Sequence, residues 1–109
     1  MKPPSMTEAQ LQASILDLCR LHGLLAFHLR DSRKNMGVGF PDLVISGVGG
    51  TIFRELKNNI LQPTPEQMRW LGTLAEGGED AALWRPDAWH SDEVAQTLAR
   101  LAKPRMEAQ

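Results

Sequence analysis

Residues 39–57 read GFPDLVISGVGGTIFRELK, in which two apolar runs flank a glycine-rich segment. The first run predicts a strand over residues 41–46, with Pro41 at its entrance, where a missing backbone donor is tolerated. The glycines of residues 47–50 predict a turn rather than a phosphate cradle, because the sequence has no phosphate-loop pattern. Residues 51–57 predict a second strand, so we expect the whole stretch to fold as a β-hairpin.

The segment before the hairpin predicts a helix and a short strand. Apolar residues at helical spacing favour a helix over residues 7–22. Gly23 follows it, at the position where a helix end favours a left-handed residue. The apolar run of residues 24–29 predicts a strand, and the polar residues 30–39 predict a loop.

The segment after the hairpin predicts two helices separated by a strand. Thr64 and Pro65 favour an N-cap and a first helical residue, and the glycines at 77–78 favour the end of that helix. Residues 80–84 predict a fourth strand, and Ser91 is the expected N-cap of a last helix. The order α-β-β-β-α-β-α predicts an α/β fold in which a mixed sheet of about four strands is flanked by helices.

Composition predicts one domain over residues 1–109, with flexible ends at 1–5 and 104–109. Hydrophobic residues make up 42% of the chain and charged residues 23%, which is ordinary for a globular protein. Cys19 is the only cysteine, which excludes an internal disulfide and a thiolate metal cluster. The sequence shows neither a signal peptide nor a membrane-spanning run, so we expect a cytoplasmic protein.

The net charge of -1 does not by itself indicate a nucleic-acid partner, but basic residues are concentrated in one region. Between residues 20 and 58, six cationic side chains stand against three acidic ones: Arg20, Arg30, Arg33, Lys34, Arg54 and Lys57 against Asp31, Asp42 and Glu55. A local basic face is compatible with phosphate binding, and equally with an ordinary solvated surface.

The chemistry of the chain is concentrated at Asp42, Glu55 and Lys57. Glu55 and Lys57 are two residues apart on a predicted strand, so they project from the same face. If the two strands of the hairpin pair, Asp42 and Glu55 converge, and two close carboxylates favour a bound cation. Carboxylate oxygens are ligands that Mg²⁺ and Mn²⁺ prefer. The alternative is a surface ion pair between Glu55 and Lys57, worth about 0–1 kcal/mol.

These motifs resemble a known nuclease family. Residues 39–44 and the Glu55-Leu56-Lys57 triplet are similar to the signature of the PD-(D/E)xK nucleases. The surrounding residues resemble the VRR-NUC branch in its small, free-standing, phage-type form, through Asp31-Ser32-Arg33, Thr64-Pro65-Glu66-Gln67, Trp70-Leu71 and Gly77. The resemblance extends from about residue 8 to residue 84, and it implies a restriction-endonuclease-like core.

The resemblance also implies roles for individual residues. Asp42, Glu55 and the main-chain carbonyl of Leu56 would bind the metal, and Lys57 would act on the nucleophile. An acid in the first helix belongs to the same pattern, and Glu8 is the candidate because its spacing places it on the inward face. The alternative for Glu8 is a capping box with Ser5 as N-cap.

For several other residues the sequence leaves two interpretations of their role open. The family pattern includes a glutamine in the helix after the hairpin, and Gln67 fits it, yet Thr64 to Gln67 also form a good capping box. Arg30, Arg33 and Lys34 would contact DNA phosphates, or belong to a solvated loop. The tryptophans, Trp70, Trp84 and Trp89, are expected in the core or at an interface rather than stacked on bases.

The resemblance predicts a DNA endonuclease dependent on Mg²⁺ or Mn²⁺, with no small-molecule cofactor. It implies a homodimer that cuts branched, Holliday-junction-like DNA, encoded by a phage and acting in the host cytoplasm. The alternatives are a restriction-like or repair nuclease, an inactive nuclease-fold module that binds DNA, and a structural α/β domain with a coincidental motif.

Overall fold

A four-stranded sheet lies at the centre of the computed structural model, which describes residues 6–29 and 37–105. The strands are β1 (Leu25–His28), β2 (Leu43–Gly47), β3 (Gly50–Leu56) and β4 (Asp80–Trp84), in that spatial order. The pairs β1–β2 and β2–β3 are antiparallel, and β3–β4 is parallel. The predicted mixed sheet and the predicted hairpin are therefore confirmed.

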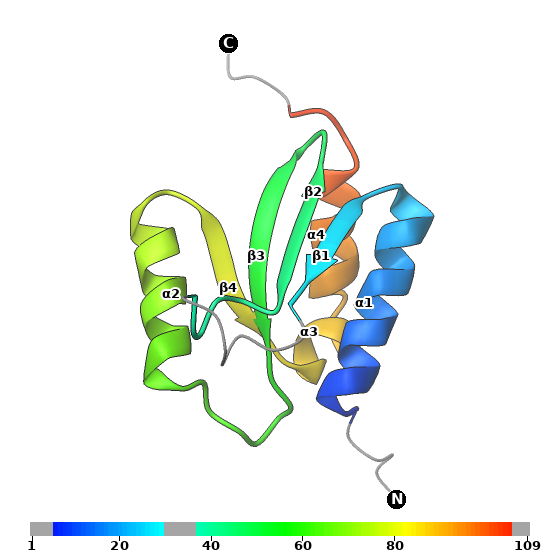
Figure 1. Ribbon diagram of the computed structural model, residues 1–109. Helices are drawn as coiled ribbons and strands as arrows, with labels where there is room; N and C mark the ends of the chain where they lie inside the picture. The colour runs from blue at the N-terminus through cyan, green and yellow to red at the C-terminus, as the bar shows by residue number, and fades with distance from the viewer. Residues whose placement is uncertain (1–5, 30–36, 106–109) are drawn as a thin grey trace, which may run out of the picture.

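Helices cover both sides of this sheet (Figure 1). Helix α1 (Glu8–His22) contacts α4 (Glu93–Leu101), and it also contacts β1 and β3. Helix α2 (Pro65–Glu76) packs against β4 and β3, and in Figure 1 it lies on the far side of β4 from α1. The predicted element order is confirmed, with one short helix added before α4.

The register of the hairpin decides which side chains enter the core. Leu43 is paired with Arg54, and Ile45 with Ile52, so these side chains share one face of the sheet. That face packs against α1 and α4 to form the core, whose largest buried apolar residues are Leu11, Ile15, Leu43, Ile45, Ile52, Leu56, Trp84, Leu98 and Leu101. Because side chains alternate along a strand, Glu55 lies on the opposite face.

The start of α1 differs from the predicted capping box. Thr7 is the N-cap: its side chain accepts a hydrogen bond from the Gln10 amide, and the Gln10 side chain accepts one from the Thr7 amide. The prediction that Ser5 and Glu8 form the capping box is therefore wrong, because Thr7 is the N-cap and the helix begins at Glu8, two residues later than a Ser5 cap would place it. Gly23 ends α1 with a φ of 70°, in the left-handed region, as predicted.

The region after β4 contains a helix that the sequence analysis did not assign. Pro86 begins the short helix α3 (Pro86–His90), where its missing amide hydrogen leaves no bond unmade. Ser91 ends α3 rather than beginning α4, and the N-cap of α4 is Asp92, with a φ of 68°. The prediction that Ser91 caps the last helix is therefore wrong.

None of the helices within residues 6–29 and 37–105 has the length and apolar character that crossing a membrane requires.

Candidate active site

Asp42 lies where β2 begins, next to the end of β3. Its Oδ2 atom accepts a hydrogen bond of 2.8 Å from the backbone amide of Leu56. Its main-chain carbonyl accepts one of 3.0 Å from the amide of Leu29, just beyond β1. These two bonds hold Asp42 against both neighbouring strands, so its carboxylate is fixed before any ligand binds.

Glu55 is the buried acid of the site, with 1% of its surface exposed. Its Oε2 atom lies 3.9 Å from Nζ of Lys57. Its Oε1 atom is buried and has no hydrogen-bond partner among the residues that the structure describes. A buried carboxylate oxygen without a partner is costly, and it indicates a site that a proton or a cation completes.

The surroundings of Glu55 disfavour its negative charge. Burial is the largest cause, followed by the neighbouring Asp42 carboxylate, and together they raise the pKa of Glu55 to about 8. Lys57 acts in the opposite direction on this pKa but does not offset the rise. Two acids at one site, one of them pushed toward neutrality, form an arrangement typical of functional sites.

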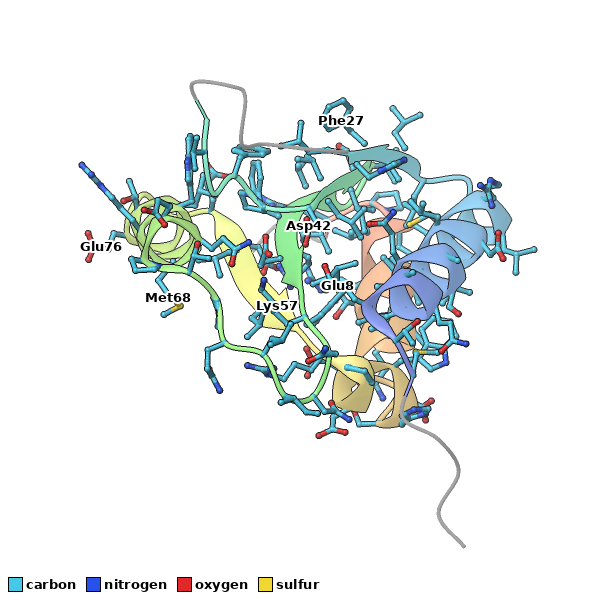
Figure 2. All side chains as sticks on the ribbon, turned by 60° about the horizontal axis from the view of Figure 1, so that its bottom comes forward. Glu8, Phe27, Asp42, Lys57, Met68 and Glu76 are labelled. Carbon is cyan, nitrogen blue, oxygen red and sulfur yellow. The ribbon has the colours of Figure 1, made fainter. Side chains whose placement is uncertain are left out.

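Lys57, directly after β3, and Glu8, at the start of α1, complete the cluster. The Lys57 side chain follows β3 and is 14% exposed. Figure 2 shows Glu8, at the start of α1, pointing toward the region of Asp42 and Lys57. Burial and the charge of Asp42 raise the pKa of Glu8, and Lys57 lowers it in part. Asp42, Glu55 and Lys57 thus lie together in the structure, as predicted, and Glu8 lies nearby.

A divalent cation fits this donor set. Asp42 and Glu55 supply hard oxygen donors, and Oε1 of Glu55, which lacks a hydrogen-bond partner among the described residues, is available to coordinate an ion. Within the described residues, no three histidine, cysteine, aspartate or glutamate side chains form a ready-made cluster. Glu8 as a metal ligand, like the carbonyl of Leu56, therefore stays a prediction.

Gln67 forms the capping box of α2 that the sequence allowed. The Thr64 amide donates to Oε1 of Gln67 at 2.8 Å, and the Gln67 amide donates to Oγ1 of Thr64 at 3.2 Å. The bond from the Thr64 amide occupies the side-chain oxygen of Gln67. A role for Gln67 in the active site remains a prediction that rests on its side-chain nitrogen.

The other predicted contacts fall into two groups. Arg30, Arg33 and Lys34 lie outside the described residues. Of the tryptophans, Trp84 lies in the core, buried beneath the Arg54 guanidinium at 4.7 Å, whereas Trp70 and Trp89 are partly buried. Trp70 donates to the carbonyl of Val38, and Trp89 packs against the core.

Comparison with known proteins finds a similar solved structure. No family model matches the chain, and neither does any curated protein. A solved structure described as a "VRR_NUC domain protein" superposes with a TM-score of 0.67, covering 97% of this chain and 98% of that one at 21% identity. The chain has the fold of a VRR_NUC domain protein. In this VRR_NUC fold, Asp42 and Glu55 stand where the two central strands meet.

The segment directly after Lys57 was not predicted from the sequence. Asn58, Asn59 and Ile60 border a hollow that Glu8 also lines, and Arg85 holds this segment from the end of β4. Arg85 is more than twenty residues away in sequence, and no local pattern links it to the loop. The placement of β4 beside β3 brings Arg85 to this loop.

Proposed function

We propose that the protein is a nuclease that hydrolyses DNA phosphodiester bonds with the help of Mg²⁺ or Mn²⁺. The observation that carries this proposal is the buried Glu55 carboxylate, with one oxygen lacking a partner, placed beside Asp42 and Lys57. The fold of a VRR_NUC domain protein supports the same activity, because a nuclease is the function that the motif resemblance implies.

Asp42, Glu55 and the main-chain carbonyl of Leu56 would hold the ion, with Glu8 as a further candidate ligand. When bound, the ion supplies Lewis acidity toward a phosphoryl oxygen. The amide of Leu56 keeps the Asp42 carboxylate in one orientation, so little reorganisation is needed on binding.

Lys57 is the residue that acts on the attacking water. Its ammonium group, 3.9 Å from Glu55, donates a hydrogen bond that orients the water for in-line attack on phosphorus. The same positive charge offsets the negative charge that develops on the phosphate oxygens. Its low exposure strengthens both interactions, because partial burial reduces screening by water.

The substrate that we propose is branched DNA, cut by a homodimer. A domain of 109 residues has little surface for reading base sequence, which favours recognition of DNA shape. β1 lies at one edge of the sheet and carries the exposed apolar residues Leu25 and Phe27, which suit a contact with a second copy. Two active sites related by a two-fold axis suit the cutting of two strands.

A panel of labelled single-stranded, duplex, flap and four-way DNA substrates tests this proposal. We expect cleavage in Mg²⁺ or Mn²⁺, none in EDTA, and a loss of about 100-fold or more in Glu55→Gln and Lys57→Ala. Glu76→Gln is the matched control, because Glu76 is exposed on the outer side of α2 (Figure 2).

The same panel separates the alternatives. Preference for a duplex of one sequence would favour a restriction-like nuclease. Binding without metal-dependent cleavage would favour the inactive DNA-binding module. Absence of both binding and cleavage would contradict the proposed function.

A further inference from the structure

A small hollow adjoins the proposed active site. It has a volume of about 190 Å³ and lies between two segments, residues 6–8 at the start of α1 and residues 58–60 directly after Lys57. Its lining residues are Met6, Thr7, Glu8, Asn58, Asn59 and Ile60. Glu8 belongs both to this hollow and to the acidic cluster, since the charges of Asp42 and Lys57 act on it.

The segment that forms one wall is held rigidly by side chains. Oδ1 of Asn58 accepts hydrogen bonds of 2.8 Å from the amides of Ile60 and Leu61. Nη1 of Arg85 donates to the carbonyls of Asn58 and Leu61, at 2.5 and 2.8 Å. These four bonds fix the backbone of the loop from two sides.

The fixed loop presents an aliphatic side chain to solvent. Ile60 is 81% exposed, although the chain on both sides of it is pinned. An aliphatic side chain gains free energy by leaving water, and this loop cannot collapse to bury it. The arrangement therefore keeps an apolar surface available for a ligand.

The lining of the hollow favours one kind of occupant. Met6 and Ile60 offer apolar contact to a flat ring, while the Asn59 amide and the Glu8 carboxyl offer hydrogen bonds to a polar edge. A nucleobase has both an apolar face and a polar edge. A phosphate would not suit the hollow, because Glu8 is acidic and no cation lines it within the described part of the chain.

We propose that this hollow binds one unpaired nucleobase of the strand whose phosphate lies at Asp42, Glu55 and Lys57. This inference rests on the proposed function. A paired base has its polar edge occupied and its faces stacked, so only an unpaired base can enter the hollow. The hollow would thus direct cleavage to positions next to unpaired nucleotides, as at a flap or a junction.

Binding of a labelled flap DNA tests the proposal without requiring cleavage. An abasic residue is moved stepwise through the single-stranded arm, and affinity is measured by fluorescence anisotropy in Ca²⁺ in place of Mg²⁺. We expect one abasic position to weaken binding to the wild type about tenfold, which corresponds to about 1.4 kcal/mol.

Variants connect that loss to the hollow. In Ile60→Ser and in Asn59→Ala, the abasic residue at that position should change affinity less than twofold, because the base contact is already gone. Val48→Ser is the matched control, since Val48 is a 72% exposed aliphatic residue in the turn between β2 and β3, and it should keep the tenfold effect.

The proposal is overturned if no abasic position weakens binding, if the flap does not bind, or if Ile60→Ser and Asn59→Ala show the same loss as the wild type. Failure of the proposed function is a separate result, because it appears as absent cleavage of the intact flap in Mg²⁺ or Mn²⁺. An intact abasic effect on an inactive protein would leave the base site standing.

Discussion

Glu55 carries the largest electrostatic strain among the described acids of the site. Its pKa of about 8 in the folded protein exceeds the ordinary value of 4.5, so the folded state binds this proton more tightly than the unfolded state does. The resulting stabilisation is complete below about pH 4.5 and is lost as the pH rises toward 8.

The first prediction follows from this proton. In EDTA, the Tm of the wild type should fall by at least about 5 °C between pH 5 and pH 8.5. Glu55→Gln should remove most of that fall, because a glutamine does not ionise. Adding Mn²⁺ at pH 8.5 should raise the Tm of the wild type but not of the variant. An identical pH slope in both proteins, measured by calorimetry, would contradict the strained carboxyl.

Asp42, Glu55 and Lys57 were predictable because all of them lie within one hairpin. Alternation along β3 places Glu55 and Lys57 together, and antiparallel pairing brings the start of β2 to the end of β3. The contact between Arg85 and residues 58–61 was not predictable, because it depends on how β4 is placed beside β3. Local spacing carries no information about such a contact.

At the scale of elements, sequence signals located the helices more reliably than their ends. Thr64 was correctly predicted as the N-cap of α2. At the start of α1, the sequence contains two overlapping pairs of residues with capping-box spacing. Ser5 with Glu8 and Thr7 with Gln10 have the same spacing, and only the structure shows that Thr7 is the cap. Helix α3 is a little over one turn long, too short for a periodic apolar pattern to reveal it.

An ion pair connects β3 with β4 at the start of β4. The Arg54 guanidinium, buried over Trp84, lies 2.9 Å from the Asp80 carboxylate and also donates to the Asp80 carbonyl. The Arg54 side chain thus connects β3 to β4. Asp80 is 42% exposed, so water screens part of this attraction.

The second prediction tests that connection. Asp80→Asn should lower the free energy of unfolding by about 1–2 kcal/mol, because the Arg54 charge stays buried without its partner. The loss should be smaller than for a fully buried pair, because Asp80 is partly exposed. Urea denaturation is the measurement. Asp87→Asn is the control, since Asp87 is exposed in α3. Equal stability of the two variants would show that the pair contributes nothing to β3–β4 pairing.

At the scale of the whole molecule, the apolar residues of β1 bear on assembly. Phe27 is 59% exposed on an edge strand and is labelled at the margin of the molecule in Figure 2. A free strand edge with apolar side chains is a surface on which a second sheet can add.

The third prediction concerns this edge. If β1 forms the homodimer contact, Phe27→Glu should convert the dimer to a monomer in light scattering, because a charge cannot be buried there without a partner. Leu21→Glu, which changes an exposed residue at the end of α1, should not alter the mass. A wild type that is monomeric at all concentrations would refute the dimer.

The hydrogen bond from the Leu56 amide to the Asp42 carboxylate forms only when β2 and β3 pair in the correct register. Assembly of the site therefore depends on formation of the hairpin. Strand pleating repeats every two residues, so a slip of one residue would turn Glu55 and Lys57 into the core and leave Asp42 facing no donor. A newly synthesised chain whose hairpin is open or paired in the wrong register would lack an assembled site. Correct pairing of the hairpin would thus be a precondition for the proposed DNA-cutting activity.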